Sequence, residues 1–77
     1  MQRELVVSSS VAWVGYAAPT RRLVVGFVRG TVYEFLDVPV GEHVALMGAE
    51  SKGRHFNQFI RGCYPHRRLA ASSSWNN

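Results

Sequence analysis

Two stretches in the first half of the chain are rich in strand-forming apolar residues, and in the second stretch the largest side chains occupy alternate positions. Leu23, Val25 and Phe27 occupy every second position of one stretch, so their side chains share a face of the predicted strand. The earlier stretch 11–16 alternates poorly, but it is rich in strand-forming residues and is flanked by small and polar ones. Residues 17–20, with Pro19 fixing the backbone, predict the turn between these two strands.

The loop after Phe27 decides which side chains of the second and third strands share a face. A two-residue loop would set Glu34 opposite Val25 and mix the faces. A three-residue loop over 28–30, with Gly30 in the left-handed conformation, keeps the large apolar residues together. Because strand register follows hydrophobic matching, we predict the longer loop, with Glu34 pointing outward. The predicted pairs are Leu23 with Phe35, Val25 with Tyr33, and Phe27 with Thr31.

Two helices are predicted after the third strand. Pro39 suits the start of the first helix, which we place over 40–48 because apolar residues recur there at helical spacing. Its apolar positions are Val40, Val44 and Met47, flanked by Leu46. Ser51 is a suitable N-cap for the second helix, and Gly62 is a suitable stop. The core-facing stripe of that helix is predicted to be Phe56, Phe59, Ile60 and Cys63.

These elements predict an α+β fold in which a three-stranded antiparallel β-meander carries two short helices packed on one face. Seventy-seven residues make one domain. We place it at residues 8–69, after an N-terminal extension over 1–7 and before a mobile tail over 70–77. Residues 64–69 are expected to be extended and to pack back on the sheet. A chain of this length excludes a dinucleotide fold or a barrel enzyme, and we expect no large enclosed pocket.

The positive charge of the chain is concentrated in its C-terminal third. Residues 1–50 carry four arginines and five acidic residues, which gives 4 − 5 = −1, whereas residues 51–77 carry five basic residues and no acidic one. The net charge of +4 therefore comes wholly from the second segment. A basic segment interleaved with aromatic residues predicts a polyanionic partner. The alternative interpretation is a solvated face that aids solubility.

The start of the second helix carries residues that are unfavourable there. Each cation near a helix N-terminus costs roughly 0.3–1 kcal/mol, and a helical glycine costs about 1 kcal/mol relative to alanine. Unpaired N–H groups, a glycine and two cations can together bind a phosphate, so we predict a phosphate site at Ser51, Lys52, Gly53 and Arg54. In the alternative, Ser51 only caps the helix, Gly53 avoids a clash with the sheet, and the cations are solvated.

Further binding residues are predicted on the C-terminal side of this helix. Arg61, Arg67 and Arg68 extend the positive surface. In the alternative interpretation, one of these arginines pairs with Glu34 or Asp37. Exposed aromatic contacts are expected from Tyr64, His66 and Trp75. Tyr33 and Phe35 would be stacking platforms if their sheet face were open. We favour core packing for both, because two helices must cover that face.

The sequence gives no indication of catalysis, a metal or another cofactor. Its three histidines are far apart, and one cysteine cannot complete a usual zinc site. Cys63 and His66 resemble a nucleophile and base, but Cys63 lies on the apolar stripe, where we expect a buried, inert thiol. A single cysteine, no apolar run of about 20 residues and no signal peptide predict a cytoplasmic protein without a membrane partner.

The order and spacing of several short motifs resemble the KTSC domain, named after the C-terminus of certain lysyl-tRNA synthetases, over about residues 8–68. Two positions depart from that family's pattern: Phe35 stands where a second tyrosine is usual, and Ala17 where a polar residue is. The matching residues are Ser9–Ser10, Val14–Gly15–Tyr16, Leu23, Val25, Phe27, Gly30, Tyr33–Glu34–Phe35, Val38–Pro39, Ser51–Lys52–Gly53–Arg54, Phe56–Asn57 and Ile60–Arg61.

The resemblance implies a small bacterial or phage protein that binds nucleic acid, RNA in preference to DNA. RNA binding is the usual suggestion for the family, and it comes from the proteins in which the domain occurs. The alternative is a protein-interaction module, such as a phage or host accessory factor that docks on an acidic protein surface or pairs a partner strand with a sheet edge. The sequence does not indicate an oligomeric state.

Overall fold

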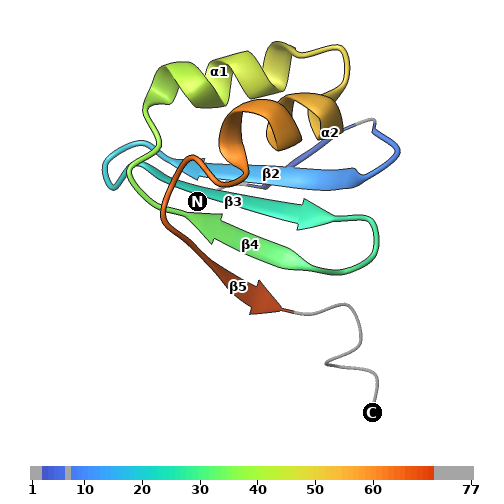
Figure 1. Cartoon of the computed structure of the whole chain (residues 1–77), viewed down its shortest axis with the longest axis horizontal. Coiled ribbons are helices and arrows are strands. Elements are labelled where there is room, and N and C mark those ends of the chain that lie inside the picture. The colour runs from blue at the N-terminus through green and yellow to red at the C-terminus, as the bar shows by residue number, and fades with distance from the viewer. Residues whose placement is uncertain (1–2, 7, 71–77) are drawn as a thin grey trace.

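A computed structural model of the chain describes residues 3–6 and 8–70. Five consecutive strands form one antiparallel sheet in the order β1-β2-β3-β4-β5. The helices lie together over one face of this sheet, and β5 lies at the edge farthest from α1 (Figure 1). In chain order the elements are β1 Arg3–Leu5, β2 Val11–Ala17, β3 Arg22–Phe27, β4 Val32–Phe35, α1 Val40–Gly48, α2 Lys52–His55, the π-helical turn η1 Phe56–Ile60, and β5 His66–Ala70.

The predicted α+β class is confirmed, but the prediction of three strands is wrong because the sheet has five. The two additional strands are its edges. β5 takes up most of the segment that we expected to be extended and also includes Ala70, which we had assigned to the tail. β1 falls within the residues that we assigned to an extension. Both are almost wholly exposed, so neither shows the hydrophobic alternation that reveals a half-buried strand. The rest of the predicted tail, residues 71–77 with Trp75, lies outside the described residues.

The predicted register between β3 and β4 is confirmed. Leu23 lies opposite Phe35, and Val25 lies opposite Tyr33. The Phe27 amide donates to the Thr31 carbonyl at 2.9 Å, and Gly30 has a φ of 101°. A side chain is disfavoured at that angle, which explains the glycine at the third loop position.

A bulge in β2 explains why the first strand alternates poorly. The register between β2 and β3 shifts between Val11 and Trp13, which leaves Ala12 as the extra residue. Val11 and Val14 therefore both point into the core, although they are three positions apart. Trp13 points to the opposite face of the sheet, where its indole lies against Gly26.

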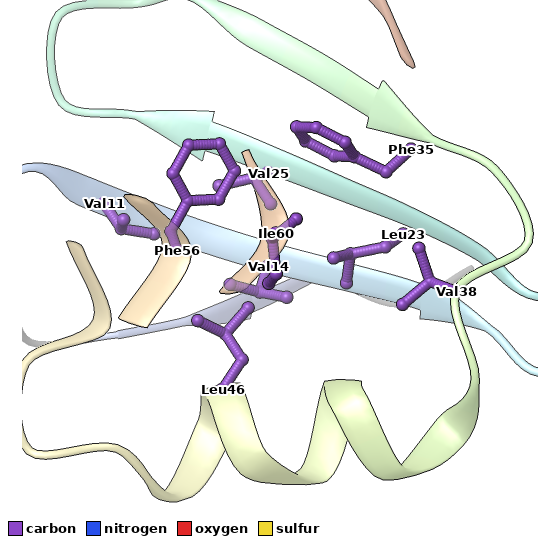
Figure 2. Close-up of a cluster of buried hydrophobic side chains, with 9 residues drawn as sticks. All are labelled: Val11, Val14, Leu23, Val25, Phe35, Val38, Leu46, Phe56 and Ile60. Atoms are coloured by element: carbon purple, nitrogen blue, oxygen red, sulfur yellow. The ribbon is translucent and has the colours of Figure 1, made fainter. Parts of the chain in front are cut away.

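The core lies between the helices and the central strands. α1 contributes Leu46, and η1 contributes Phe56 and Ile60, whose side chains point toward β2 and β3 (Figure 2). The complete buried cluster is Val11, Val14, Leu23, Val25, Phe35, Val38, Leu46, Phe56 and Ile60. The first helix has the predicted bounds, but its predicted apolar positions are only partly right, since Val40 and Val44 are exposed and Leu46 is the buried residue.

The second helix is not a continuous α-helix. Its last turn widens, because the Arg61 amide donates to the Phe56 carbonyl five residues earlier, at 2.8 Å. The wider turn changes which residues share a face. Phe59 and Cys63 were predicted to be buried, and both are exposed: Phe59 lies in the widened turn, and Cys63 lies beyond the end of the helix. Gly62 does end the segment, with a φ of 78°.

Glu34 points away from the helices, as the register requires. The alternative in which one of the C-terminal arginines pairs with Glu34 is confirmed for Arg67. The Glu34 side chain is only 3% exposed, because Arg22 and Arg67 from the neighbouring strands both bind its carboxylate. The Arg67 Nε donates to Glu34 Oε1 at 2.7 Å. The helix-free face of the sheet therefore carries a buried carboxylate held between two partly exposed guanidinium groups.

Replacement of Gly26 by alanine is expected to destabilise the fold, because the new methyl group would overlap the Trp13 indole. The ring would have to leave the sheet and its contact with the Arg3 guanidinium, 4.3 Å from the ring centre. We expect a loss of about 1–3 kcal/mol in urea unfolding. Gly41→Ala is the matched control, since nothing lies within 4 Å of the added methyl, and it should be neutral or stabilising. Equal stability of the two variants would contradict the assigned packing of Trp13.

Candidate nucleic-acid interface

An open groove of about 920 Å³ lies on the helical side of the sheet, along β4. We expected a chain of this size to enclose no such space, and the groove exists because it is open to solvent rather than enclosed. The helical layer covers the central strands but leaves β5 and the adjoining side of β4 uncovered (Figure 1). The lining residues are Ser9, Ser10, Phe27, Val28, Arg29, Thr31, Tyr33, Phe35, Phe56, Asn57, Arg61, Gly62 and His66.

The floor of the groove is a set of aromatic rings contributed by four elements. Phe56 from η1 packs edge-on against Phe27 and Phe35, with ring centres 5.2 and 5.4 Å away. His66 from the edge strand lies 5.9 Å from Tyr33 and 5.6 Å from Phe35. Phe35 and Phe56 are buried, whereas Phe27 and Tyr33 are half-buried and His66 is exposed. The accessible ring surface therefore comes from the last three.

The two possible stacking platforms, Tyr33 and Phe35, differ in their exposure. Phe35 is 2% exposed and belongs to the core, as we favoured. Tyr33 packs against the same cluster, but its ring also lines the groove. Tyr33 is therefore available to a ligand, which core packing alone would not allow.

The polar lining of the groove contains cations, hydroxyls and an amide, and none of its residues is acidic. Arg29 is exposed in the β3–β4 loop. Arg61 follows η1, and its Nη1 donates to Asn57 Oδ1 at 3.4 Å. Asn57 within η1 and Arg61 at its end therefore both line the groove.

At the predicted phosphate site at the start of α2, contacts within the chain account for most of the residues. The Ser51 hydroxyl accepts from the Arg54 amide at 3.3 Å, so Ser51 is the N-cap as predicted. The Lys52 ammonium donates to the Ala49 carbonyl at 3.1 Å. A methyl group on Gly53 would collide with the Ser10 hydroxyl. Lys52 and Gly53 therefore need no anion to account for them, and Arg54 is left as the exposed cation of this turn.

The remaining predicted residues lie on three different surfaces. His66 and Arg61 line the groove, and Arg68 lies opposite Tyr33 in the β4–β5 ladder, which puts its side chain on the groove side. Arg67 points to the other face and binds Glu34. Tyr64 is half-buried beside α1.

Sequence reasoning missed five polar residues of the groove: Ser9, Ser10, Arg29, Thr31 and Asn57. Three of them, Ser9, Ser10 and Asn57, belong to the motifs that carry the family resemblance. That signal placed them in the domain but not in a common site, since they come from segments far apart in the sequence. Arg29 carried no signal beyond its place in a hairpin loop.

Tyr64 is held by a small polar cluster that joins α1 to α2 and to the segment before β5. Glu42 accepts from the Tyr64 hydroxyl at 3.4 Å, and its other oxygen lies 2.9 Å from His55 Nε2. Burial, followed by the charge and hydrogen bond of Glu42, raises the pKa of Tyr64 above its usual value of 10.0. The folded state therefore holds this proton more tightly than the unfolded chain.

The raised pKa of Tyr64 predicts a loss of stability in alkali. The stabilisation is complete below pH 10 and is lost as the pH rises through the higher pKa of the folded state. Tyr64→Phe removes both the hydrogen bond and this titration. We expect wild type to have the higher Tm at pH 8 and the difference between the two to narrow above pH 10. A difference that stays constant or widens would contradict the contact with Glu42.

Neither a metal centre nor a membrane helix is found in the part of the chain that the structure describes. Residues 3–6 and 8–70 contain no group of three His, Cys, Asp or Glu side chains placed to hold a metal ion. Over the same residues, no helix has the length and apolar character needed to span a bilayer.

The fold and the groove define a small α+β domain with an aromatic, cation-bordered surface beside an exposed sheet edge. The KTSC domain matches residues 7–64. The chain belongs to the KTSC domain family.

Similar proteins fall into two groups. A lysine–tRNA ligase of Nostoc punctiforme is 37% identical over 62 residues, which are 80% of this chain and 11% of the ligase. The chain thus spans about a tenth of the length of such ligases. An uncharacterized protein of Stutzerimonas stutzeri is 39% identical over 61 residues, covering 79% of this chain and 86% of that protein.

A solved structure has a similar fold over most of the chain. The crystal structure of a KTSC domain protein from Yersinia pestis has a TM-score of 0.84 and 37% sequence identity to this chain. The match covers 90% of this chain and 97% of the other.

Proposed function

We propose that this chain is a non-catalytic module that binds nucleic acid, RNA in preference to DNA, across the groove and its bordering cations. The observation that carries the proposal is the composition of the groove: aromatic rings beside Arg29 and Arg61, with no acidic residue in the lining. Proteins that bind single strands combine stacking rings with a positively charged groove in this way.

The distribution of charge across the two faces of the sheet supports a polyanionic ligand on the helical side. Arg68 adds a third cation there. Glu34, the acidic residue of β4, points to the other face and is neutralised by Arg22 and Arg67. The negative charge of Glu34 therefore does not offset the positive charge of the groove.

The relatives support RNA over DNA. Several similar sequences are segments of proteins named lysine–tRNA ligase, and tRNA is the nucleic acid that this name specifies. The rings, hydroxyls, amide and cations of the lining can stack on, hydrogen-bond with or attract a ligand. We therefore assign the groove neither a catalytic step nor a cofactor.

An electrophoretic shift assay tests the proposal. The wild-type chain should retard a mixed-sequence RNA at about 50 mM salt, and its affinity should fall as salt is added, because each phosphate contact releases counterions. An acidic protein of similar size serves as the control for non-specific retardation. No retardation of RNA or DNA at about 50 mM salt or below would overturn the proposal.

A protein-interaction module is the second candidate, and the exposed position of β5 favours it. Among residues 3–6 and 8–70, this strand pairs with β4 alone, so its outer backbone groups could pair with a partner strand. The exposed Arg67 and Arg68 would favour an acidic partner. Recovery of one stoichiometric protein with the tagged chain from its host, combined with no RNA binding, would favour this function over the first.

A further inference from the structure

We infer that the groove is a pocket for an unpaired nucleobase, so that the chain recognises single-stranded RNA rather than duplex. The inference rests on the proposed function and specifies the ligand of the same site. Its starting point is the accessible ring surface of Phe27, Tyr33 and His66, which lies in one groove on three neighbouring strands.

The arrangement of the rings fits a flat ligand. Phe27 stands nearly perpendicular to Tyr33, at 83° between ring planes and 6.2 Å between centres. His66 also meets Tyr33 at a steep angle, 63°. Neither Phe27 nor His66 is therefore stacked on the Tyr33 ring, and the exposed surface of this ring offers a stacking platform for one base.

The polar groups of the groove suit the rest of a nucleotide. Ser9, Ser10 and Asn57 provide donors and acceptors of the kind that bind base edges. Arg29 and Arg61 supply charge for the phosphates on either side of that base. A groove of about 920 Å³ is also within the range of small-ligand sites.

A duplex does not satisfy this arrangement. Its bases are paired and stacked on one another, so their faces cannot reach a protein ring. The groove cations would still meet duplex phosphates, but the rings would contribute nothing. The preference for a single strand thus separates the base pocket from simple attraction between charges.

The test compares a single-stranded 12-nucleotide RNA with the duplex of the same sequence, by fluorescence anisotropy at a fixed salt concentration of about 50 mM. The single strand should bind at least about tenfold more tightly. Tyr33→Ala should abolish that preference, and Tyr33→Phe should retain it. Phe59→Ala is the matched control, because Phe59 is an exposed ring on η1 outside the groove, and it should bind like wild type.

His66→Ala keeps the test decisive if Tyr33→Ala does not fold. This exposed ring lies on an edge strand, and its loss should reduce the preference without disturbing the core. Equal, salt-dependent binding of single strand and duplex would overturn the base pocket and leave the proposed function standing. Equal loss of preference with Phe59→Ala would also overturn it. No binding of either RNA would overturn both.

Discussion

Replacement of both Arg22 and Arg67 by methionine should lower the free energy of unfolding by roughly 3 kcal/mol, even though both arginines reach the surface. The reason lies in Glu34, which is 3% exposed and would lose both of its partners. Removal of one side of a buried ion pair leaves an uncompensated charge in a poorly solvated site. Urea unfolding followed by circular dichroism measures the loss.

A third substitution shows whether the buried charge is the cause. Glu34→Leu in the double variant removes that charge, and apolar replacement of a buried ionic cluster is often neutral or stabilising. Most of the lost stability should therefore return. A triple variant no more stable than the double variant would mean that the arginines stabilise the sheet by packing alone.

Reversal of the charge at the two groove arginines, Arg29 and Arg61, should have the largest effect on RNA binding. Arg29→Glu together with Arg61→Glu should weaken the affinity for single-stranded RNA by about 100-fold. The slope of log affinity against log salt concentration should fall by the amount expected for the loss of about two phosphate contacts. Fluorescence anisotropy at several salt concentrations gives both quantities.

The matched control for this variant is Arg3→Glu with Arg21→Glu, which changes the net charge by the same amount. Arg3 lies over Trp13 on the helix-free side, and Arg21 precedes β3 in the turn after β2. Neither lines the groove. This control should keep most of the affinity. An equal loss in both variants would mean that overall charge, not the groove, attracts the RNA.

The sequence predicted the centre of the sheet because hydrophobic matching leaves one acceptable register. Only the three-residue loop ending at Gly30 puts Val25 opposite Tyr33 and keeps Glu34 off the core face. The edge strands could not be found in this way, since a strand that buries no face, such as Arg3–Leu5, carries no alternation.

The candidate site was less predictable than the fold because it depends on local deviations from regular structure. A spacing rule assumes a regular helix, so it assigned Phe59 and Cys63 to the core. The helix instead widens at Phe56–Ile60 and ends before Cys63, and both side chains are exposed. Asn57 and Arg61 line the groove. The same rule cannot show that Gly53 accommodates the Ser10 hydroxyl, because this contact joins segments that are far apart in the sequence. The contact explains the glycine without an anion, and the phosphate site at the start of the helix stays a prediction.

Titration of the isotopically labelled chain with a short single-stranded RNA, followed by two-dimensional NMR, tests the central claim most directly. Backbone and side-chain signals locate the surface that meets the ligand without any substitution. The groove interface predicts the largest shifts at Arg29, Tyr33, Asn57, Arg61 and His66, with little change on the helix-free face around Trp13. Shifts confined to residues 51–54 or to the helix-free face, with the groove signals unmoved, would contradict it.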